Sequence, residues 1–117
     1  MSDLIREFLV QGSEETPYKV VFKKNGPNLT ALCNCRAGVM GQLCKHRLAI
    51  LYGDNTAVVG NSTAEVAEVA SWLEGSNVAD AISEVVSLEA QKKHIETKIK
   101  RAKKLVAEAL LPKRSNP

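Results

Sequence analysis

The sequence has few aromatic residues and lacks long apolar runs. Only 4% of its 117 residues are Phe, Trp or Tyr, which excludes a core of many large rings. A small domain of this composition often needs a bound metal for stability. No apolar run approaches the roughly 20 residues that span a bilayer, and the start, MSDLIREFLVQGSEE, is too charged for a secretory signal. We therefore expect an intracellular protein with reduced thiols, cytoplasmic or, in a eukaryote, nuclear.

Cysteine is also scarce, and it is confined to one place. All three cysteines and one of the two histidines fall within CNCRAGVMGQLCKH. An odd number of cysteines argues against a disulfide framework. Three thiolates and one imidazole complete the tetrahedral shell of a zinc ion and leave no open position for catalysis. We therefore predict that one structural Zn²⁺ is bound by Cys33, Cys35, Cys44 and His46.

The spacing of these ligands constrains the backbone. Residues i and i+2 of a strand point to the same side, so Cys33 and Cys35 converge if the strand curls at its end. On a helix such residues lie about 200° apart, so Cys44 belongs at or just before a helix start, with His46 in the first turn. Two alternatives are three merely buried cysteines and a Cys–His nucleophile or redox pair. The paired spacing disfavours the first, and the lack of an evident acidic orienting group disfavours the second.

The flanking sequence predicts a hairpin followed by a helix. YKVVFK (18–23) alternates in the manner of a strand, KNGPN is a turn, and LTALC (29–33) is a second strand that delivers the first cysteine. CKHRLAILYG predicts a helix that ends at Gly53, with Leu48, Leu51 and Tyr52 facing the hairpin. TAVVG (56–60) fits either a short strand or a linker.

This arrangement resembles the SWIM zinc finger. The family has the signature Cys-x-Cys, a variable gap and Cys-x-His, within a ββα unit whose helix begins at the last two ligands. The resemblance covers about residues 17–53. It implies that the metal ligands are Cys33, Cys35, Cys44 and His46. Members occur in mutator-type transposases and chromatin-remodelling-type ATPases. The resemblance implies binding of DNA or of another protein, without catalysis.

The rest of the chain is expected to be helical. Leu4, Ile5, Phe8 and Leu9 predict a short N-terminal helix, so residues 1–16 form a helix and linker and residues 17–60 the zinc module. Residues 61–117 form a helical region, with a helix over 63–74 capped by Ser62 and a long helix over 78–111 before a basic tail. The predicted class is α+β: a small ββα module followed by a helical hairpin or a long coiled-coil helix.

The long helix carries a heptad repeat. Its a positions are Val78, Val85, Lys92, Ile99 and Val106, and its d positions are Ala81, Leu88, Ile95, Ala102 and Ala109. Nine of these ten are apolar. This pattern favours a helix that supercoils with a partner helix over a straight amphipathic helix. Two arrangements satisfy this pattern: a homodimer through residues 78–111, most simply antiparallel, and an intramolecular hairpin with the helix over 63–74.

Charge is distributed in blocks along the chain. Residues 54–90 contain no Lys or Arg and seven acidic residues, whereas residues 91–117 contain nine basic and two acidic residues. A basic stripe of this kind binds phosphates, although the same pattern is common on a solvated coiled-coil face. The candidate nucleic-acid contacts are Arg36, Lys45, Arg47, Lys92, Lys93, Lys100, Arg101, Lys103 and Lys104.

Two functions follow from these patterns. The first is a non-enzymatic zinc-binding protein that contacts DNA or another nucleic acid as an accessory factor. The second is an adaptor that docks a protein partner through the finger or the coiled coil. The acidic block favours the second, because it repels nucleic acid.

Overall fold

The computed structural model of the protein describes residues 3–60 and 63–112. The fold is α+β, as the sequence predicts. The chain divides into two compact units, Met1–Ala79 and Asp80–Pro117. The first unit extends past the zinc module predicted for residues 17–60, because strands and helices on both sides of that module belong to it.

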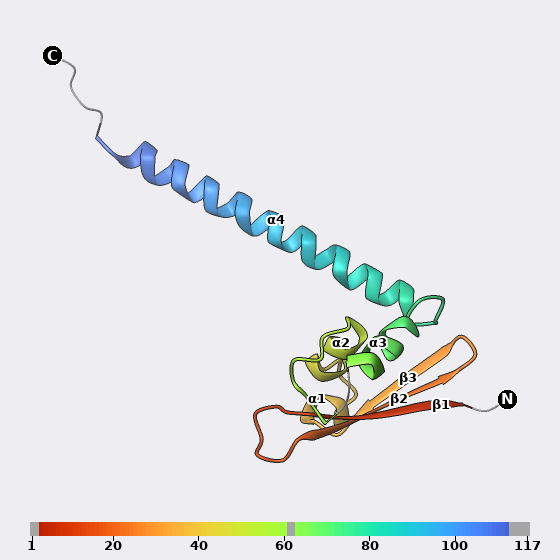
Figure 1. Ribbon diagram of the computed structural model, residues 1–117. Coiled ribbons are helices and arrows are strands. Elements are labelled where there is room, and N and C mark those ends of the chain that lie inside the picture. Colours follow the sequence, from red (N-terminus) through yellow and green to blue (C-terminus); the bar gives the residue numbers. More distant parts are fainter. Residues whose placement is uncertain (1–2, 61–62, 113–117) are drawn as a thin grey trace. The chain divides into compact units, whose positions relative to one another are not determined.

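A four-stranded antiparallel sheet forms the base of the first unit (Figure 1). The strands lie in the order β3-β2-β1-β4. Their bounds are β1 (Leu4–Val10), β2 (Tyr18–Asn25), β3 (Asn28–Cys33) and β4 (Val58–Val59). The predicted hairpin is confirmed as β2 and β3, joined at Gly26, whose positive φ of 58° suits a tight turn. The segment 56–60, which fits either a strand or a linker, contributes the short strand β4.

The predicted N-terminal helix is wrong, because residues 4–10 form strand β1. Leu4, Ile5, Phe8 and Leu9 fit a helical stripe, but Phe8 and Val10 also fit the two-residue period of a strand. All seven residues of β1 pair with β2, from Leu4 opposite Lys24 to Val10 opposite Tyr18. Pairing over this length satisfies the backbone and buries Phe8 and Val10 on the inner face.

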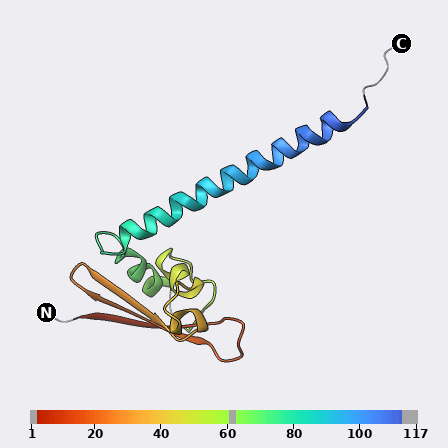
Figure 2. The same cartoon turned by 180° about the vertical axis from the view of Figure 1, so that it is seen from behind.

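Helices α1 (Arg36–Val39), α2 (Lys45–Leu51) and α3 (Thr63–Ser71) pack on the sheet of the first unit (Figure 1, Figure 2). Of these, α2 and α3 supply the buried helical residues on its inner face, whereas α1 has none. Phe8 and Phe22 meet edge to face at 6.0 Å between ring centroids, and Val20, Ile50, Val66 and Val69 are buried with them. Tyr52 was predicted to face the hairpin, but its side chain is 47% exposed. Ile50, which is 1% exposed, lies in the core.

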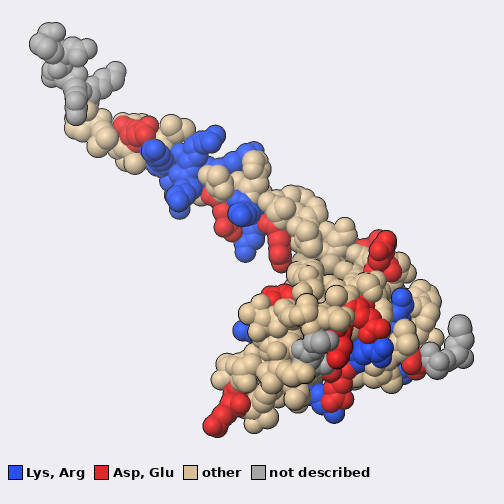
Figure 3. All heavy atoms as spheres, viewed as in Figure 1, with Lys and Arg blue, Asp and Glu red and all other residues tan. Residues whose placement is uncertain are grey.

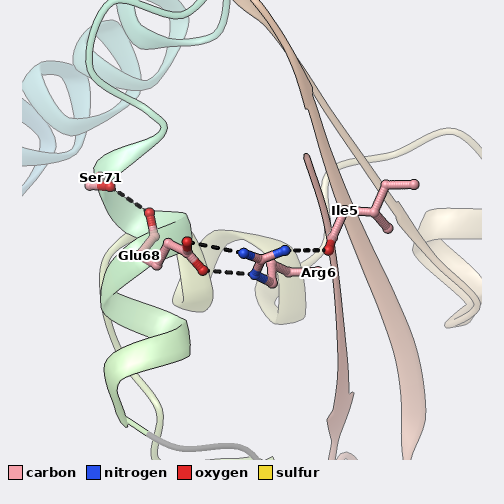
Figure 4. Close-up of polar contacts among 4 residues, drawn as sticks. All are labelled: Ile5, Arg6, Glu68 and Ser71. Atoms are coloured by element: carbon pink, nitrogen blue, oxygen red, sulfur yellow. Dashed lines mark hydrogen bonds and ion pairs between the residues drawn. The ribbon is translucent and has the colours of Figure 1, made fainter. Parts of the chain in front are cut away.

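One ion pair links β1 to α3 (Figure 4). Nε and Nη2 of Arg6 donate hydrogen bonds to the two carboxylate oxygens of Glu68, at 2.7 and 3.1 Å. A third nitrogen of Arg6 donates to the carbonyl of Ile5, and the guanidinium lies 5.8 Å from the centre of the Trp72 ring. This partly exposed bidentate contact links α3 to the first strand, beside the packing of the buried Val66 and Val69.

The second unit consists mainly of α4 (Ala79–Leu110), whose bounds agree with the predicted long helix. Within residues 3–60 and 63–112, no helix is both long enough and apolar enough to cross a bilayer. The predicted cap at Ser62 and most of the predicted basic tail, residues 113–117, lie outside the described residues.

Candidate metal centre

The structure brings the four predicted ligands together. The candidate ligand atoms of Cys33, Cys35, Cys44 and His46 all lie within 4.8 Å of one another, and all four side chains are buried. Cys33 ends β3, Cys35 precedes α1, and Cys44 and His46 open α2. Three elements of the first unit therefore meet at one point.

Two of the cysteines are the N-caps of the helices that follow them. The Cys35 sulfur accepts a hydrogen bond from the backbone N–H of Gly38 at 3.3 Å, and the Cys44 sulfur accepts one from Arg47 at 3.5 Å. A helix start offers unpaired N–H groups, and such donors stabilise a thiolate. The expectation that Cys44 directly precedes the helix, with His46 in its first turn, is confirmed.

Helix α1 was not among the helices predicted from the sequence. Its tight approach to β3 depends on Gly38. A Cβ atom added at Gly38 would lie 2.2 Å from the carbonyl oxygen of Cys33, which is closer than atoms can approach. The absence of a side chain there lets the chain reverse directly after the first two cysteines.

Arg47 neutralises charge inside the cluster. Its Nε donates to the Cys44 sulfur at 3.2 Å, and its other nitrogens donate to the carbonyls of Ala31 and Gln42. The half-buried guanidinium is thus held by three hydrogen bonds to the protein, whereas Arg36 and Lys45 are exposed. Of Arg36, Lys45 and Arg47, which the sequence suggested as nucleic-acid contacts, Arg47 is the one that donates a hydrogen bond to a ligand sulfur and can offset its charge.

His46 presents one ring nitrogen to the cysteines and the other to a confined space. Nδ1 lies 3.8 Å from the Cys33 sulfur. The ring is tilted against Tyr18, with centroids 4.8 Å apart, and a Cβ atom added at Gly12 would lie 3.1 Å from Nε2. Tyr18 and Gly12 therefore fix the imidazole, a role that their sequence context did not reveal.

Burial and hydrogen bonding set different pKa values for the ligands. Burial raises the pKa of the Cys33 thiol to about 12. Burial also acts to raise the pKa of Cys44, but hydrogen bonds from the backbone and guanidinium of Arg47 bring it below its ordinary value. Burial and then the charge of Lys45 lower the pKa of His46, which favours the neutral imidazole that binds metals.

These distances fit a single zinc ion. Zinc bonds of about 2.3 Å to sulfur and about 2.0 Å to nitrogen place two ligands of a tetrahedral shell about 3.5 to 3.8 Å apart. The Cys33 sulfur and His46 Nδ1 are 3.8 Å apart, at the upper end of this range, and all four ligand atoms lie within 4.8 Å of one another, so the cluster is at most about 1 Å wider than a metal-bound shell. The donor set, three sulfurs and a nitrogen, is the kind that zinc prefers.

Comparison of the chain with family models, curated proteins and solved structures finds no match. The resemblance to the SWIM finger therefore depends on the ligand spacing and on the order of the surrounding elements. The structure extends that order with β1, β4, α1 and α3, which surround the hairpin and α2 within the same unit.

The remaining predicted contacts lie on α4, in the other unit. Lys92, Lys93, Lys100, Arg101, Lys103 and Lys104 are all exposed. Figure 3 shows Lys and Arg side chains gathered along α4, with acidic side chains beside them. We call these six residues the basic stripe.

Removal of one ligand should abolish metal binding. We expect the protein purified without a tag to contain one zinc per chain by elemental analysis, and Cys44→Ser to contain none. His94→Ala, an exposed histidine on α4, is the matched control and should retain full occupancy. Chelation should also unfold the first unit, because binding and folding are coupled in small zinc modules. Zinc-free protein with unchanged circular dichroism after chelation contradicts the assignment.

Loss of the guanidinium beside Cys44 should weaken zinc binding without removing a ligand. For Arg47→Met we expect about a 10- to 100-fold lower zinc affinity, the usual effect of losing a group that supports a ligand. Arg36→Met removes the same charge from an exposed position and should bind zinc as the unaltered protein does. Competition with a chromophoric chelator measures both, and equal affinities would show that Arg47 has no such role.

Proposed function

We propose that the protein is a non-enzymatic zinc-binding module that binds DNA or another nucleic acid. The observation that supports the zinc part is the buried Cys3His cluster, whose four ligand atoms lie within 4.8 Å of one another. Four protein ligands fill a tetrahedral zinc shell, so no position is left for a substrate or an activated water. The ion would hold β3, α1 and α2 together.

The basic stripe supports the nucleic-acid part of the proposal. Its six side chains come from residues 92–104 of α4 and are exposed, so they can reach phosphates. Arg36 and Lys45 add two exposed positive charges beside the zinc cluster. Because Arg47 is tied to Cys44 and to two carbonyls, we leave it out of the proposed contact surface.

Binding to nucleic acid should fall steeply with salt. At 50 mM salt we expect a gel shift with single- or double-stranded DNA or RNA, because contacts to phosphates release counterions. Six contacts would lower the affinity by about 1,000-fold between 50 and 200 mM salt. The triple variant Lys93→Gln, Lys100→Gln, Arg101→Gln should bind more weakly and reduce the salt slope by about one for each phosphate-binding side chain replaced.

The matched control removes three positive charges from another element. Lys19→Gln, Lys23→Gln, Lys24→Gln changes strand β2 and leaves α4 intact. We expect its salt slope to equal that of the unaltered protein. If both triple variants lose affinity equally, net charge and not the stripe drives binding. If the unaltered protein produces no shift at 50 mM salt with any of the four nucleic acids, the nucleic-acid proposal fails.

A second candidate function, docking of a protein partner, is favoured by exposed apolar residues near the cluster. Leu32 and Val39 have exposures of 73% and 72%, and they line one shallow hollow. Met40 and Leu43 are also exposed, on the segment between the two ligand pairs. Large apolar side chains gathered on a surface are typical of protein contact sites.

The adaptor function predicts a protein partner that stays bound after nuclease treatment. A pull-down from cell extract should retain it, and Val39→Asp should release it, because the partner would have to bury the new carboxylate. Val86→Asp, the same change at an exposed position of α4, should leave it bound. Retention by both variants, or loss of all captured protein after nuclease, argues against docking at this surface.

A further inference from the structure

We propose that α4 pairs with α4 of a second copy as an antiparallel coiled coil. The contact surface is the seam, defined as the a and d positions from Val78 to Ala109. In the antiparallel arrangement an a residue of one chain packs beside a d residue of the other. Full overlap of the seam sets Lys92 opposite Ile95, Val85 opposite Ala102, and Ala81 opposite Val106. This pairing goes beyond the zinc and nucleic-acid functions and does not depend on either.

Most of the seam is exposed along the helix, whereas Val85 is half-buried, as is Val78, which directly precedes α4. Ile95 and Ile99 have exposures of 53% and 48%, and Leu88 and Val106 are similarly open. Leu105 and Leu110 lie on its flanks and are also exposed. An apolar strip that follows a heptad repeat for over four heptads needs a partner helix, since a partner removes the strip from water.

Helix α3, which the predicted intramolecular hairpin would pair with α4, packs within the first unit. Val66 and Val69 of α3 are fully buried, and α3 lies against α2 and is tied to β1 by Glu68. The hairpin alternative needs Val66, Val69, Ala70 and Leu73 to pack on the long helix, and the first two of these are already buried in the first unit. A second copy of the chain has an identical seam of equal length. We therefore assign α4 of a second copy as the partner of this seam.

The position of Lys92 favours the antiparallel orientation. In a parallel pair, a residues face each other, so two Lys92 ammonium groups would meet in the core. In the antiparallel pair each Lys92 lies beside Ile95 of the other copy. Its methylene stem can then cover the isoleucine while its ammonium group reaches water.

The charge blocks favour the same orientation. Asp80, Glu84 and Glu89 occupy the first part of α4, and the basic residues from Lys92 to Lys104 occupy the second. A parallel pair would align basic with basic along about 20 Å of helix. The antiparallel pair aligns the acidic part of each copy with the basic part of the other, which stabilises the complex and selects its orientation.

Mass measurement tests the pairing itself. Sedimentation equilibrium of the zinc-loaded full chain at about 10 µM should give twice the mass of the chain. Ile99→Asp, which places a carboxylate in the seam, should raise the dimer dissociation constant about 100-fold or more. Thr97→Asp, two residues away and outside the seam, should leave it within a few-fold. A monomer at this concentration, or equal effects of the two changes, overturns the proposal.

Disulfide trapping tests the orientation. Ala81→Cys with Val106→Cys in one chain should form a covalent dimer on mild oxidation, because these positions face each other across the antiparallel pair. Either single variant should remain uncrosslinked, since identical positions then lie about 37 Å apart. In a parallel pair, each single variant would crosslink and so refute the orientation. Unaltered zinc-loaded protein controls for the three native cysteines, and zinc content and circular dichroism report whether each variant is folded.

Discussion

The first unit depends on the convergence of three sulfurs and one imidazole in a small buried volume. Thiolates at these separations repel one another, and burial makes each charged form costly. This cost raises the pKa of Cys33, whereas hydrogen bonds from Arg47 stabilise the thiolate of Cys44 and lower its pKa. A divalent cation would offset this cost at all four ligands at once. Because those ligands end β3 and begin α1 and α2, the energy gained at the ion would stabilise the backbone of the whole unit.

The hairpin, the start of α2 and the extent of α4 were predictable because each is encoded locally. Alternation and a glycine turn define β2 and β3, and the i, i+2 geometry of Cys44 and His46 allows only a helix that starts at the cysteine. The heptad repeat of α4 persists without Gly or Pro until Pro112. The four ligands were predictable for a related reason: all lie within 14 consecutive residues, so their convergence needs little information from the rest of the fold.

Strand β1, helix α1 and the surroundings of His46 were missed because they depend on distant or short contacts. The apolar residues of β1 fit both periods, and the pairing with β2 that decides between them cannot be read from seven residues. Helix α1 is four residues long and exists because Cys35 caps it and Gly38 fits against Cys33. Tyr18 reaches His46 from a strand that precedes it by nearly 30 residues, and neither residue type signals that contact.

The acidic residues of 54–90 are divided between the two units and have different local partners, which changes what their total charge implies. Glu68 is neutralised by Arg6 within the first unit, and Asp54 accepts hydrogen bonds from Thr56 in a local turn. Asp80, Glu84 and Glu89 belong to α4, where the proposed pairing sets them beside the basic half of the other copy. The block therefore offers less repulsion to nucleic acid than its total charge suggests. Lys93, Lys100, Arg101 and Lys104 lie outside the seam in the heptad repeat, so self-association would leave these four charges facing solvent. Pairing and phosphate binding are thus compatible on one helix for these four residues, whereas Lys92 would lie in the seam and Lys103 beside it.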